Sequence, residues 1–178
     1  MSKTNNLIFT ILLVIAWIIF VGLCIEAGGL IVNFVFSVYK PEFVQNLYQK
    51  LDLSEVYKYS ELTFFVIYGY IIAIAVSKVW LFYTVVILMH KMDLSNPFNS
   101  FVSKQIAKIS YFTLFIGLLS LVASKVVESL MPEAAINGTL NQFWGESEAF
   151  ILMGAVVYII SVIFKKGVEI KDEHDLTL

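Results

Sequence analysis

Residues 7–25 read LIFTILLVIAWIIFVGLCI, an apolar run that meets no charged side chain before Glu26. An apolar run of about 18 or more residues is long enough to cross the roughly 30 Å hydrocarbon core of a bilayer as a helix. A helix is favoured in lipid because it satisfies all of its backbone hydrogen bonds internally. This stretch therefore predicts a membrane-spanning helix, with weaker helical character continuing to Val38.

Three further apolar runs follow, at about residues 62–88, 106–130 and 149–164. With the first run, at about 7–38, they predict an all-α integral membrane protein with four transmembrane helices in a single domain, residues 1–178. The composition agrees, because only 15% of the 178 residues are charged, against about 25% in soluble domains. The mean hydropathy of +0.83 points the same way.

The lysines predict how the chain is oriented, since cytoplasmic loops carry an excess of basic residues. If the N-terminus is cytoplasmic, the cytoplasmic segments contain Lys3, Lys91, Lys104, Lys108, Lys165, Lys166 and Lys171, and the outer loops only Lys40, Lys50 and Lys58. Four spans then leave both termini in the cytoplasm. Residues 165–178 are predicted to form a cytoplasmic acidic tail.

Both outer loops contain residues suited to the membrane surface. In the first loop, residues 41–51 place Phe43, Leu47 and Leu51 four residues apart, which predicts a short amphipathic helix on the outer interface. A lipid-resting connector and a lid or partner surface are both consistent with this pattern. In the second loop, Phe143 and Trp144 are predicted to anchor the chain at the membrane–water boundary.

Four charged residues fall within the predicted spans: Glu26, Lys78, Lys125 and Glu128. Three of them are expected near the outer leaflet, where Lys125 and Glu128 have the i, i+3 spacing of a helical ion pair. Because Glu26 is expected at a similar depth, the three side chains are candidates for an outer polar cluster.

Lys78 is expected deeper in the membrane, about 15 Å from the end of its span at Leu88. The predicted spans place no carboxylate at this depth, and a central lysine costs about 2.5–3.5 kcal/mol. In one interpretation, the long side chain reaches the cytoplasmic interface. In the other, it lies in a water-filled crevice, beside hydroxyl or aromatic partners such as Tyr158 or Trp17, or against a neighbouring subunit.

Several function classes are disfavoured by what the sequence lacks. Cys24 is the only cysteine, and the two histidines, His90 and His174, show no metal-ligand spacing. All twelve basic residues are lysines and the net charge is −2, which does not suggest nucleic-acid binding. We therefore expect no catalytic site, no metal or other cofactor and no direct nucleic-acid binding, with membrane lipid as a partner.

Two stretches that are predicted to face the cytoplasm resemble a known family. Residues 91–106 read KMDLSNPFNSFVSKQI and residues 167–178 read GVEIKDEHDLTL. The Asn-Pro-Phe turn between the second and third spans, and the acidic segment closing on Asp-Leu-Thr, resemble the bacterial domain of unknown function 2975 family. The chain departs from the family pattern at Asn99-Ser100-Phe101, where acidic residues are usual, and in using lysine where arginine is common.

The resemblance implies an integral protein of a bacterial inner membrane with no established activity. Genes of this family often lie beside small helix-turn-helix regulators, so a cytoplasmic regulator is the partner that the resemblance implies. The expected function is thus that of a non-catalytic regulatory or scaffold partner. Its expected docking residues are Asn96, Pro97, Phe98, Glu169, Glu173, Asp175, Leu176 and Thr177.

The alternative is a small transporter or channel assembled from several copies of the chain. It would use Lys78 within the membrane and Glu26, Lys125 and Glu128 in the outer leaflet as polar stations. A second copy of the chain is then a further expected partner.

Overall fold

The computed structural model of the chain describes residues 3–40, 42, 44, 53–94, 96–131 and 140–175. Every regular element in these ranges is helical. The long helices are α1 (Lys3–Tyr39), α3 (Glu61–Lys91), α4 (Ser100–Leu130) and α6 (Ser147–Asp175), and a short helix, α2 (Ser54–Tyr59), precedes α3. The four long helices are each long and apolar enough to cross a membrane. The predicted all-α membrane protein with four spans is confirmed.

All four long helices extend beyond the predicted ranges, and α4 and α6 do so the most. The predicted third span begins at 106, but α4 begins at Ser100, where the Asn99 side chain accepts a hydrogen bond from the Val102 backbone N–H at 2.9 Å. This is an ordinary helix N-cap. Helix α6 continues past the last apolar residue, Phe164, to Asp175. Hydropathy therefore located the apolar spans but not the helix ends.

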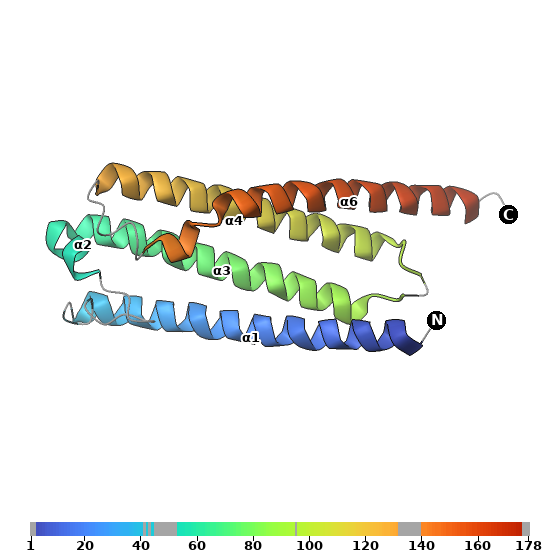
Figure 1. The fold of residues 1–178 in the computed structure, drawn as a ribbon, viewed down its shortest axis with the longest axis horizontal. Coiled ribbons are helices and arrows are strands. Elements are labelled where there is room, and N and C mark those ends of the chain that lie inside the picture. The colour runs from blue at the N-terminus through green and yellow to red at the C-terminus, as the bar shows by residue number, and fades with distance from the viewer. Residues whose placement is uncertain are drawn as a thin grey trace.

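The long helices pack mainly in chain order, with α1 against α3, α3 against α4 and α4 against α6. Figure 1 shows them side by side along their length, with both chain termini and residues 92–99 at one end and α2 at the other. We call these the terminal end and the far end. Helix α6 extends beyond its neighbours at the terminal end (Figure 1).

The core is densest toward the far end, where α3 supplies most of the buried side chains. Phe64, Ile67, Tyr68 and Ile71 are fully buried there, and Leu30 of α1 is buried against them. The Tyr68 hydroxyl donates a hydrogen bond to the Leu30 carbonyl oxygen at 3.2 Å. This contact fixes α1, a helix that is apolar on every side, to one face of α3.

Helices α4 and α6 approach closely because glycines face the partner helix. A Cβ atom at Gly117 would lie 2.8 Å from the Ile151 backbone nitrogen, and one at Gly154 would lie 2.8 Å from that of Leu114. Small residues permit such contacts between membrane helices. Gly69 on α3 is different, since no atom outside its own stretch of helix lies within 4 Å of the position its Cβ would occupy.

Several buried hydroxyl groups donate hydrogen bonds to carbonyl oxygens of their own helix. Ser77 donates to the Ala73 carbonyl at 2.7 Å and Thr113 to the Ile109 carbonyl at 2.7 Å. The Thr84 hydroxyl likewise donates to the Trp80 carbonyl at 2.9 Å. These internal bonds let serine and threonine occupy an apolar helix without an external partner.

The residues just before α6, from Leu140 onward, fold into the protein. Residues 140–144 are helical, and Leu140, Phe143 and Trp144 are buried in the core. The predicted anchoring of Phe143 and Trp144 at the membrane boundary is therefore wrong, because both pack among the helices. The predicted amphipathic helix at residues 41–51 lies outside the described residues, apart from residues 42 and 44.

Candidate functional site

The Asn-Pro-Phe turn between α3 and α4 is held by its own hydrogen bonds. The Asn96 backbone N–H donates to the Asp93 carbonyl at 3.1 Å, and that of Asn99 donates to the Pro97 carbonyl at 3.2 Å. The Asn99 side chain donates to the Asn96 carbonyl at 2.9 Å while its oxygen caps α4. A single asparagine thus closes the turn and begins the next helix.

The turn is also docked on the part of α6 that follows the apolar span. The Phe98 ring stacks at a tilt on Phe164, with 5.1 Å between the ring centroids. A Cβ atom at Gly167 would lie only 2.7 Å from the Phe98 ring, so the glycine makes room for this contact. The Lys171 ammonium donates a hydrogen bond to the Asn96 side-chain oxygen at 2.8 Å.

These contacts unite the two stretches that the sequence singled out into one surface. We call residues 96–99 with residues 164–175 of α6 the terminal platform. It presents two exposed apolar side chains, Phe98 and Ile170, with exposed fractions of 42% and 66%. An aromatic and an aliphatic group among charged neighbours is a usual composition for a protein contact.

Charged side chains surround the apolar part of the terminal platform. Lys166 and Glu169 form an ion pair at 2.7 Å, and Asp172 and Glu173 are exposed. Helix α6 ends at Asp175. Of the predicted docking residues, Leu176 and Thr177 lie outside the described part of the chain, as does the Asp175 side chain.

Lys78 lies at a second polar site, between α3, α4 and the start of α6. Its ammonium nitrogen is 5.8 Å from the centroid of the Phe150 ring, within the range of a cation–π contact. Lys78 also lines a cavity of about 10 Å³ with Ser120, Gln142, Glu146 and Ser147. That volume is about the minimum that holds one water molecule.

The surroundings of Lys78 differ from those expected for its depth. The predicted spans placed no carboxylate near it, but Glu146 lines the same cavity because the connection before α6 folds inward. The side chain has an aromatic neighbour, although this is Phe150 and not the suggested Tyr158 or Trp17.

The predicted outer polar cluster is not brought together within one copy of the chain. Lys125 and Glu128 form the expected i, i+3 ion pair at 2.7 Å, with side-chain exposures of 71% and 62%. Glu26 lies on α1, which packs mainly against α3, and no ion pair joins it to either residue within the described ranges.

Gly167 and Lys171 are contact residues that sequence reasoning did not assign. An isolated glycine in a helical stretch is a recognised sign of close packing, so Gly167 carried a usable signal. The contact from Lys171 to Asn96 spans 75 positions, and no sequence signal indicated it.

The chain was compared with known protein families, curated proteins and solved structures. The model of a family described as "Protein of unknown function (DUF2975)" matches residues 39–178. Neither a curated protein nor a solved structure matches the chain.

Proposed function

Because the chain belongs to the DUF2975 family of proteins of unknown function, we propose a role for it from its own geometry. It is a non-catalytic protein of a bacterial inner membrane that presents the terminal platform to a cytoplasmic protein. The partner is a regulator of the helix-turn-helix class, as expected from the family resemblance. Both termini then lie in the cytoplasm.

One observation carries this proposal: the turn and the extension of α6 are joined into a single surface. The 2.8 Å hydrogen bond from Lys171 to Asn96 and the packing of Phe98 against Gly167 hold the two parts together. A preorganised surface binds at lower entropic cost than two separate flexible segments. The lysine distribution supports the cytoplasmic orientation, because α3 ends at Lys91 and the α6 extension carries Lys165, Lys166 and Lys171.

The apolar side chains of the terminal platform support a protein partner. Beyond Phe164 the helix has left its apolar span, so Phe98 and Ile170 are not covered by hydrocarbon. Ile170 lies three residues from Gly167, which makes it a neighbour of the Phe98 contact on the helix surface. Exposed apolar groups of this kind are typical anchors of a protein interface.

A matched pair of substitutions tests the proposal. Ile170 and Ile163 are both exposed on α6, at 66% and 61%, but Ile163 lies in the apolar span and Ile170 beyond it. In affinity purification from native membranes, Ile170→Ala and removal of residues 169–178 should each reduce recovery of the cytoplasmic partner. Ile163→Ala should retain it. The same set of recovered proteins with Ile170→Ala and with Ile163→Ala would contradict the proposal.

A small transporter or channel is the second candidate, favoured by the polar site at Lys78. The cavity at Lys78 has a volume of about 10 Å³, which is space for about one water molecule. So small a cavity favours the proposed binding of a protein partner over the passage of a solute. Flux in reconstituted vesicles that is lost with Lys78→Met and retained with Lys125→Met would favour transport.

A further inference from the structure

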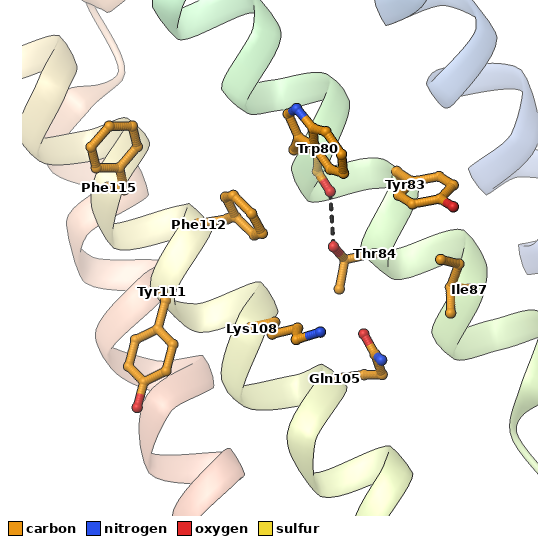
Figure 2. Close-up of a pocket in the computed structure, with 9 residues that line it drawn as sticks. All are labelled: Trp80, Tyr83, Thr84, Ile87, Gln105, Lys108, Tyr111, Phe112 and Phe115. Carbon is orange, nitrogen blue, oxygen red and sulfur yellow. Dashed lines mark hydrogen bonds between the residues drawn. The ribbon is translucent and has the colours of Figure 1, made fainter.

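A large groove lies between α3 and α4 and shares no lining residue with the cavity at Lys78. Its volume is about 700 Å³, and most of its lining is aromatic or aliphatic. Figure 2 shows the lining residues: Trp80, Tyr83, Thr84 and Ile87 from α3, and Gln105, Lys108, Tyr111, Phe112 and Phe115 from α4. Volumes of this size are typical of sites for small molecules.

Two polar side chains enter the groove from α4. The Lys108 ammonium and the Gln105 amide point into the space between the helices (Figure 2). Neither side chain makes a hydrogen bond or ion pair with any residue in the described ranges. Lys108 lies eight residues after the first residue of α4, Ser100, or about 12 Å along the helix from its terminal end.

The groove has a polar end and an apolar end, and their order follows from the helix directions. Helix α3 runs toward the terminal end and α4 runs away from it, so Gln105 and Lys108 are the α4 lining residues nearest that end, with Ile87 of α3 at a similar level. Trp80 and Phe115 lie deeper in the membrane. The groove is therefore polar toward the terminal end and apolar deeper in the membrane. A phospholipid in the leaflet on that side has its headgroup and acyl chains in the same order.

A second groove shows that this polarity is not general. It has a volume of about 370 Å³ and is lined by residues of α3, α4 and α6 that include Leu81, Phe82 and Met153. None of its lining residues is charged. Of these two grooves, the one with Lys108 is the one that offers a cation to a lipid headgroup.

We propose that the groove between α3 and α4 binds an anionic phospholipid of the leaflet on the terminal side. The phosphate lies at Lys108 and Gln105, and one acyl chain lies along Trp80 and Phe115. A lysine beside a membrane surface strengthens the binding of anionic lipid by about 1 kcal/mol. This corresponds to about a fivefold preference over a lipid with no net charge.

Tryptophan quenching tests the proposal, because Trp80 lines the groove. With Trp17→Phe and Trp144→Phe, Trp80 is the only tryptophan of the full chain. The protein is reconstituted in phosphatidylcholine vesicles that contain a small fraction of brominated phosphatidylglycerol or brominated phosphatidylcholine. We expect the brominated phosphatidylglycerol to quench Trp80 about fivefold more effectively, and added salt to reduce the difference.

Two lysine variants of this protein complete the test. Lys108→Met should remove the preference, whereas Lys104→Met should retain it, because Lys104 is exposed on the same helix but does not line the groove. Equal quenching by the two lipids in the parent protein would overturn the proposal, as would a preference that survives Lys108→Met. Weak quenching by both lipids, with a cross-linked dimer formed through position 83, would show that a second copy fills the groove.

Discussion

Alanine at Gly154 should weaken the contact between α4 and α6. The new Cβ atom would lie 2.7 Å from Leu114 Cγ and 2.8 Å from the Leu114 backbone nitrogen, whereas ordinary contacts begin at 3.4 Å. The leucine side chain can rotate, but the backbone nitrogen cannot move without its helix. The helices must therefore separate by about 0.6 Å at this point, the difference between 2.8 Å and 3.4 Å.

The expected cost follows from two opposing effects. Overpacking of a close contact costs about 1–3 kcal/mol. Replacing glycine by alanine in a helix stabilises the helix by up to about 1 kcal/mol. We expect a net loss of about 1–2 kcal/mol, which lowers the folded-to-unfolded ratio roughly 5- to 30-fold. Gly117→Ala should behave alike, because its Cβ would lie 2.8 Å from the Ile151 backbone nitrogen.

The measurement is a titration of the purified protein from mild detergent into dodecyl sulfate. Dyes on cysteines at Lys104 and Lys165, in a Cys24→Ser background, report the separation of α4 and α6 by energy transfer. Gly69→Ala is the control, because no atom outside its own stretch of helix lies within 4 Å of its added Cβ. That variant should unfold at the same dodecyl sulfate concentration or a higher one. If Gly154→Ala is as stable as Gly69→Ala, the reasoning about backbone contact is refuted.

Three other predictions concern the hydrogen bond between α1 and α3, the docked turn and the orientation. Tyr68→Phe should lower the free energy of unfolding by about 0.5–1.5 kcal/mol in the same titration, because the bond to the Leu30 carbonyl is lost; an equal loss with Tyr70→Phe would contradict this assignment. Phe98→Ala should speed amide hydrogen exchange at Asn96, Asn99 and residue 98, measured by mass spectrometry, and unchanged exchange would argue against docking of the turn on α6. Single cysteines at positions 96 and 172 should react with a membrane-impermeant maleimide only after the cells are opened, and labelling of intact cells would reverse the proposed orientation.

The number of spans was determined by the sequence alone. A bilayer admits few backbone structures, and each crossing needs about 20 apolar residues, so runs such as 7–25 reveal helices without knowledge of their neighbours. The cap at Asn99 is similarly local, because the side chain bonds a backbone group three residues away. Features that depend only on lipid or on adjacent residues were therefore predictable.

The lateral arrangement was decided by tertiary structure. Hydropathy does not indicate which face of α1 meets α3, because α1 is apolar on every side. The sequence also could not place Glu146 beside Lys78, since this requires the connection before α6 to fold inward. The contact of the α6 extension with Asn96 likewise depends on a partner 75 residues away. In lipid, apolar faces gain little by choosing one neighbour over another, so close packing and a few polar contacts make that choice.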